Sequence, residues 1–160
     1  MTWDASYPMA RQQYNWTCSV ASLTWVLQAT ETAYVGADVY AAREQAGITM
    51  GYPSCVNETY GCMSAQCVVD ALAAYGLTAR AVTTTFDEAY AIARQTTGCI
   101  NPHGMYHFMG IRGVDGIEPG DIWVANSASP SYYGVGDSLT RDKYNALGPV
   151  TLIYLEQPQP

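Results

Sequence analysis

The sequence predicts an α+β domain with an antiparallel sheet. Helical apolar spacing is concentrated in the N-terminal half, strand-like runs are concentrated in the C-terminal half, and 160 residues are enough for one domain. That single domain is expected to span residues 1–160, with 156–160 as a flexible tail. A chain of this length buries roughly 70% of its unfolded surface, so it can build a core without metal or crosslinks.

The predicted helices are, in order, 18–28, 37–45, 65–75, 86–94 and a single turn at 142–147. The first helix is apolar on nearly every side, which indicates a central, buried position. Asn15 or Thr17 can cap it, so Cys18 is expected in its first turn. Ser64 and Thr85 are good N-caps for later helices, and Gly76 is the expected stop of the 65–75 helix.

The predicted strands are 78–83, 106–113, 121–125 and 150–155. The 106–113 run places His107 on one face with Met109, and an Asp115-Gly116 turn signal follows it. If the two strands on either side of this turn fold back symmetrically, Gly113 faces Gly120 and His107 faces Asn126. A slip of one residue in this register would turn the two side chains to opposite faces.

The charge balance argues against nucleic acid and anionic membranes as partners. Seven basic and 14 acidic residues give a formal charge of −7, and Lys143 is the single lysine of the chain. Because binding to a polyanion needs clustered lysine and arginine, this composition is unsuitable. No apolar run approaches the roughly 20 residues that cross a bilayer, so no membrane insertion is expected.

The cysteine count suggests an oxidising compartment. Five cysteines in so small a chain favour a secreted or cell-surface protein, although the first residues do not form a signal peptide. The count is odd, so four paired cysteines would leave one thiol over.

Cys18 is the candidate nucleophile among these cysteines. A sulfur at a helix N-terminus feels unpaired N–H groups and the positive end of the helix dipole, which lower the pKa of the thiol. The competing interpretation is that Cys18 is a buried small apolar residue or half of a disulfide.

A thiolate nucleophile needs an imidazole partner, and the chain has two histidines, His103 and His107. His103 lies in a polar loop sequence and is more simply read as solvent-exposed. His107 begins an apolar strand, where a buried imidazole requires a hydrogen-bond partner. The side-chain amide of Asn126 is the expected partner, and Gln12, six residues before Cys18, is a candidate donor to an oxyanion.

The sequence resembles the papain-like cysteine peptidases in the order of four features. These are Gln12, Cys18 with Ala21-Ser22-Leu23, His107 in an apolar strand, and Asn126 after Ile122-Trp123-Val124-Ala125. The resemblance is closest to the small bacterial group similar to the bacteriocin leader-processing peptidases. It extends over nearly the whole chain, including Tyr75-Gly76-Leu77 and Gly148-Pro149. Two positions differ: Ser19-Val20 stands where the family commonly has a small pair such as Gly-Pro, and Asn126 stands where the bacterial group often has Asp.

The resemblance implies a papain-like fold, in which the helix that carries the nucleophile packs on a C-terminal antiparallel sheet. It also implies roles: Cys18 as nucleophile, His107 as general base and acid, Asn126 as the residue that orients His107, and Gln12 as oxyanion donor. The expected protein is a monomeric thiol hydrolase that cleaves a peptide or amide bond through a thioester, on a peptide or protein substrate and without a cofactor. The alternatives are a cell-wall amidase or acyl transferase with the same triad, and a papain-like binding module without turnover.

If Cys18 is kept for catalysis, the other four cysteines can form two disulfides with three possible connectivities. The pairing that we expect is Cys55 with Cys62 and Cys67 with Cys99. Zinc binding is disfavoured, because the chain has no C-x-x-C spacing and its histidines lie far from these cysteines in sequence.

Overall fold

The computed structural model describes residues 3–9, 18–32, 65–102, 107–115, 120–128 and 136–156. Its elements are, in order, α1 (Cys18–Ala29), α3 (Ala65–Ala74), β1 (Ala79–Thr84), α4 (Phe86–Ala93), β2 (Gly98–Pro102), β3 (Met109–Val114), β4 (Ile122–Ala125), β5 (Ser138–Leu139), α5 (Arg141–Ala146) and β6 (Val150–Leu155). Several predicted features lie outside the described residues: the 37–45 helix, the loop from Gly47 to Gly61, the caps Asn15, Thr17 and Ser64, the Cys55–Cys62 disulfide, and residues Gln12 and His103.

The six strands form one sheet in the order β1-β6-β2-β3-β4-β5. Every neighbouring pair is antiparallel, which confirms the predicted α+β class with an antiparallel sheet. The last strand of the chain, β6, lies between β1 and β2 and pairs with both. The sheet is therefore complete only when the C-terminal strand has been inserted.

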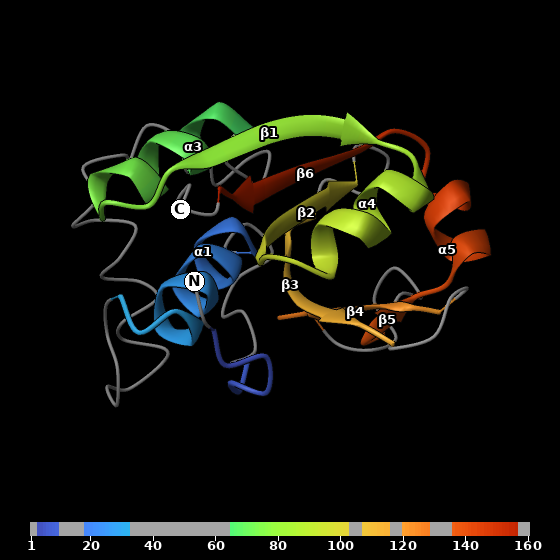
Figure 1. Cartoon of the computed structure of the whole chain (residues 1–160), viewed down its shortest axis with the longest axis horizontal. Helices are drawn as coiled ribbons and strands as arrows, with labels where there is room; N and C mark the ends of the chain where they lie inside the picture. Colours follow the sequence, from blue (N-terminus) through green and yellow to red (C-terminus); the bar gives the residue numbers. More distant parts are fainter. Residues whose placement is uncertain are drawn as a thin grey trace.

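The two faces of the sheet carry different helices. In β2 the side chain of Cys99 packs in the cluster around α1 and α3, whereas Ile100 packs in the cluster around α4 and α5. In β6 Ile153 and Leu152 divide in the same way. This alternation follows from the two-residue period of a strand. Figure 1 shows α1 and α3 at the left of the sheet and α4 and α5 at its right.

The helix ends follow the predicted signals. Thr85 caps α4: its hydroxyl oxygen accepts a hydrogen bond from the Glu88 N–H, and the hydroxyl donates to Glu88 Oε1. At the end of α3, Gly76 has a φ of +81°, and the Leu77 N–H donates to the Leu72 carbonyl. This is a Schellman ending, in which the positive φ favours glycine.

Two strands were not predicted, and one was predicted too early. The β2 segment is bounded by Gly98 and ends at Pro102, and both of its faces are buried, so it has neither alternation nor length to mark it. The two-residue β5 is too short to leave a pattern. The strand predicted over 106–113 is observed as Met109–Val114, so His107 lies just before it. In the described ranges, no helix has the length and apolar character needed to cross a membrane.

Candidate active site

Cys18 is the first residue of α1, as the sequence predicts, and its side chain is fully buried. It belongs to a core cluster that also contains Cys99, Phe108 and Ala125. Phe108 directly follows His107, and Ala125 directly precedes Asn126. The apolar packing around Cys18 therefore includes the chain neighbours of both other predicted site residues that the structure describes.

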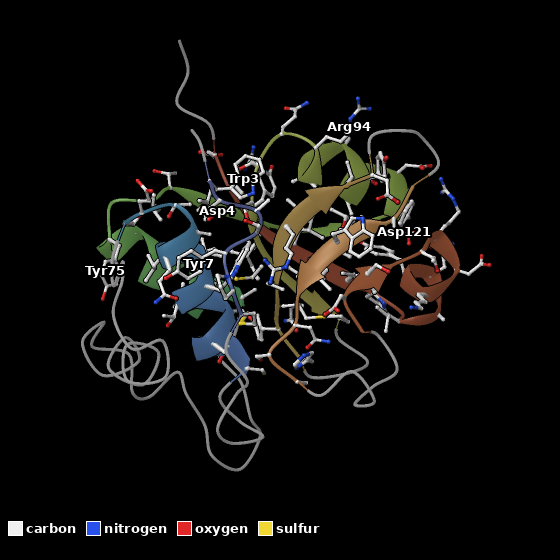
Figure 2. All side chains as sticks on the ribbon, turned by 90° about the horizontal axis from the view of Figure 1, so that it is seen from below. Trp3, Asp4, Tyr7, Tyr75, Arg94 and Asp121 are labelled. Carbon is white, nitrogen blue, oxygen red and sulfur yellow. The ribbon has the colours of Figure 1, made fainter. Side chains whose placement is uncertain are left out.

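The N-terminal segment is held against α1 and β3 through Tyr7. The Tyr7 carbonyl accepts hydrogen bonds from Trp25 Nε1 at 2.8 Å and from an Arg112 guanidinium nitrogen at 2.7 Å. The same nitrogen of Arg112 donates to the Ala5 carbonyl at 2.8 Å, and the guanidinium lies 5.3 Å from the centre of the Trp25 ring. Figure 2 shows Trp3, Asp4 and Tyr7 along this segment beside α1. These contacts tie the Cys18 helix to the strand that follows His107.

His107 is 1% exposed and its ring lies against the amide of Asn126, with Nε2 2.8 Å from Asn126 Oδ1. The two residues are 19 apart in the chain, and they lie just before β3 and just after β4. The structure thus brings together two of the four predicted site residues through a direct hydrogen bond.

The predicted register that led to this pair was wrong. Gly110 pairs with Ala125 and Ile111 with Val124, which is two residues away from the predicted alignment, and an irregularity between Ile111 and Gly113 shifts the pairing once more. An offset of two residues keeps each side chain on its face of the sheet, since the strand period is also two. His107 therefore reaches Asn126 diagonally rather than directly across.

The orientation of the Asn126 amide is fixed by two further hydrogen bonds. Its Nδ2 donates to the Gly136 carbonyl at 2.9 Å, and its Oδ1 accepts from the Ala128 N–H at 3.0 Å. The atom that faces His107 is therefore an acceptor, so the ring nitrogen opposite it must carry the proton. In neutral His107 the proton lies on Nε2, and Nδ1 keeps a lone pair that can accept another proton.

Burial lowers the pKa of His107 below its ordinary value of 6.5, and the hydrogen bond to Asn126 opposes this shift in part. Desolvation disfavours the charged imidazolium, whereas the Asn126 oxygen stabilises it. Because the first effect is larger, the pKa of His107 is lowered, which favours the neutral imidazole that can act as a base.

Cys99 is a second thiol beside Cys18. It is fully buried and carries no disulfide, so the predicted Cys67–Cys99 bridge is wrong. Burial and, as the smaller cause, the nearby charge of a Cys18 thiolate raise the pKa of Cys99 to about 12. Its position in β2 on the same face as α1 explains this environment, which the cysteine spacing alone could not reveal.

Possible metal ligands were compared in the part of the chain that the structure describes. There, no group of three or more histidine, cysteine, aspartate or glutamate side chains is arranged to hold a metal ion. The backbone groups of Gly136 and Ala128 hold the Asn126 amide, and the sequence did not predict this role. Nothing in the sequence marks a backbone hydrogen bond of this kind.

Comparison with protein-family models finds no match for the sequence, and comparison with curated proteins finds none either. Comparison with solved structures finds a double glycine motif protease from an AMS/PCAT transporter, determined in complex with the leader peptide. The superposition has a TM-score of 0.67 with 20% identity, and it covers 97% of this chain and 95% of that one. The two chains share one fold. This likeness confirms the predicted papain-like α+β fold and agrees with the resemblance to leader-processing peptidases.

Proposed function

We propose that this protein is a cysteine peptidase with a triad of Cys18, His107 and Asn126. The observation that carries the proposal is the 2.8 Å contact between His107 Nε2 and Asn126 Oδ1, in which the amide is held so that His107 Nδ1 is left as a base. The position of Cys18 at the start of α1 and the fold shared with a double glycine motif protease support it.

The chemistry follows from these groups. His107 Nδ1 takes the proton of the Cys18 thiol, and the sulfur attacks the carbonyl carbon of the substrate. The oxyanion is stabilised by N–H groups at the start of α1 and, by our proposal, by the side-chain amide of Gln12. Protonated His107 then gives its proton to the leaving amine, which breaks the C–N bond and leaves a thioester. Water, activated by His107, attacks the thioester and releases the acid together with the restored thiol.

The environment of His107 suits this cycle. Its lowered pKa keeps the ring neutral before attack, so it is ready to accept the thiol proton. The Asn126 oxygen stabilises the imidazolium that forms, because a charge-assisted hydrogen bond is stronger than a neutral one. Asn126 is itself uncharged, so it orients the ring without holding His107 protonated at rest.

The proposed substrate is a peptide. The similar protease was determined with its leader peptide, which lies in the same class as the peptide or protein substrate expected from the sequence. Ser19 and Val20 follow the nucleophile here, and both are bulkier than the small pair common in the family. We therefore test peptides with Gly-Gly at the cleavage point beside otherwise identical peptides with Ala-Ala and Val-Val.

The test is alkylation of Cys18 by iodoacetamide as a function of pH, read by mass spectrometry of the modified peptide. We expect Cys18 to react at pH values well below the ordinary thiol pKa of about 8.5, and His107→Ala to remove most of this reactivity. His103→Ala is the matched control and should leave the profile unchanged. Because Cys18 is buried, rates are compared between variants at one pH, so that access to the sulfur affects all of them alike.

Peptide cleavage is followed in parallel, with water and a primary amine competing for the thioester. Free acid as the main product indicates a peptidase, whereas an amide product indicates an acyl transferase. Loss of reactivity in His103→Ala but not in His107→Ala would overturn the proposed triad. If Cys18 in the unmodified protein is alkylated no faster than Cys18 in the His107→Ala variant, the result would favour a binding module without turnover.

A further inference from the structure

Asn126 is anchored by the chain on both sides of the segment that follows it. Its Oδ1 accepts from the N–H of Ala128, and its Nδ2 donates to the carbonyl of Gly136. The same Oδ1 faces His107 at 2.8 Å. The amide can therefore make all three contacts in one orientation only.

Gly136 presents its carbonyl to Asn126 from an unusual backbone conformation. Its φ is +64°, in the left-handed region where a side chain is strained, although a Cβ at this position would meet no atom within 4 Å. The next residue is fixed as well, because the Asp137 carbonyl accepts a hydrogen bond from the Val124 N–H at 2.9 Å. The chain directly after Gly136 is thus held to β4 through Asp137, while the carbonyl of Gly136 itself accepts from the Asn126 amide.

We propose that Gly136 is a positioning residue for the active site: its carbonyl holds the Asn126 amide so that oxygen, not nitrogen, faces His107. This inference rests on the proposed function, since it matters to catalysis only if His107 is the base. Without this acceptor, the amide loses one of the hydrogen bonds that keep its Nδ2 away from the ring. In the reversed amide, Nδ2 would donate to His107 Nε2, the ring proton would move to Nδ1, and Nδ1 could no longer take the thiol proton.

The experiment replaces Gly136 by valine, which strains the left-handed conformation and moves the carbonyl. Gly136→Asn is the rescue variant, because asparagine tolerates a positive φ better than other residues with a side chain. Gly148→Val is the matched control: Gly148 has a φ of +74° and equal room for a Cβ, but it lies between α5 and β6 and takes no part in the Asn126 contacts. Gly136→Ala replaces the valine variant if the latter does not fold.

The first readout is the tautomer of His107, taken from its ring ¹⁵N chemical shifts in histidine-labelled protein. We expect the proton on Nε2 in the unmodified protein, in Gly148→Val and in Gly136→Asn, and a mixture of Nε2-H and Nδ1-H in Gly136→Val. The second readout is the Cys18 alkylation rate, which should be lower in Gly136→Val than in Gly148→Val, in proportion to the fraction of molecules that keep the Nε2-H tautomer.

The proposal is overturned if Gly136→Val keeps the single Nε2-H tautomer, or if Gly148→Val shows the same mixture and the same slower alkylation. Neither outcome depends on whether the protein is a peptidase, because the tautomer is read without substrate. Conversely, if His107→Ala does not affect Cys18 but Gly136→Val still mixes the tautomers, the proposed function fails while the positioning role of Gly136 stands.

Discussion

Trp25 occupies the space that a side chain at Gly110 would need: an ideal Cβ at Gly110 would lie 2.4 Å from Trp25 Cε3. Trp25 is seven residues after Cys18 on α1, and Gly110 is three residues after His107. Seven residues are close to two helical turns, so Cys18 and Trp25 share a face of α1. The missing side chain at Gly110 therefore sets how closely the Cys18 helix approaches β3, the strand that follows His107.

From this contact we predict that Gly110→Ala destabilises the protein by about 1–3 kcal/mol, as is usual when a methyl group is forced into a packed core. Urea unfolding measures the change. Trp25→Phe removes the ring atoms in the way, so the double variant should lose less than the sum of the single variants. Additive losses would contradict the proposed contact.

Gly98→Ala should be more damaging than Gly110→Ala. A Cβ at Gly98 would lie 2.0 Å from the backbone oxygen of Ile153, in the interior strand β6, and backbone cannot turn aside as an indole ring can. A smaller loss of stability for Gly98→Ala than for Gly110→Ala would show that β2 and β6 can separate without cost.

The hydrogen bond between Asn126 and His107 predicts a defined effect of Asn126→Ala. The bond raises the pKa of His107, so its removal lowers that pKa further and makes the imidazolium harder to form. A hydrogen bond to a charged group contributes about 1.5–3 kcal/mol, so the Cys18 alkylation rate near pH 7 should fall about 10- to 100-fold. Asn145→Ala, an exposed position in α5, is the control and should react like the unmodified protein.

The buried His107 also makes stability depend on pH. The unfolded chain binds a proton at the ordinary pKa of 6.5, whereas the folded chain binds it only at lower pH, because burial lowers the pKa of His107. Below pH 6.5 the unfolded state therefore holds more protons, and the free energy of unfolding falls as pH decreases until the folded pKa is passed. We expect this fall in urea titrations of a Cys18→Ser protein.

His107→Gln should remove this dependence above pH 5, which is the control for the assignment. Hydrogen-bond partners also lower the pKa values of Asp4 and Asp87. The contribution of these two carboxylates to stability is lost only as pH falls below the ordinary carboxyl pKa of 3.8. An unchanged pH dependence in His107→Gln would mean that another group causes the fall.

Comparison of the sequence with the structure shows which predictions depend on local pattern. Cys18 at the start of a buried helix and the Thr85 cap are set by neighbouring residues, and both are confirmed. The pairing of His107 with Asn126 was predicted from an incorrect register, yet it survived because the error was two residues and strand faces repeat every two.

The failed predictions depend on contacts between distant parts of the chain. Cys99 was assigned to a disulfide from the number of cysteines, whereas its environment is decided by the packing of β2 against α1. The strand β2 itself exists because β6 and β3 pair on either side of it. The anchoring of Asn126 by Gly136 likewise requires a backbone conformation that residue types alone do not specify.

Cys99 provides the last prediction, because the described part of the chain includes two buried free thiols and the proposed mechanism uses one. The thiolate is the reactive form, and burial raises the pKa of Cys99 to about 12, so almost no thiolate exists at neutral pH. We expect Cys99 to remain unmodified by iodoacetamide at about pH 7.5 in folded protein and to react fully after unfolding in urea. Mass spectrometry of the Cys99 peptide, without prior reduction, makes both measurements. The Cys99→Ala variant should keep the His107-dependent reactivity of Cys18. If Cys99 instead stays unreactive in urea until a reductant is added, Cys99 forms a disulfide, as the sequence suggested.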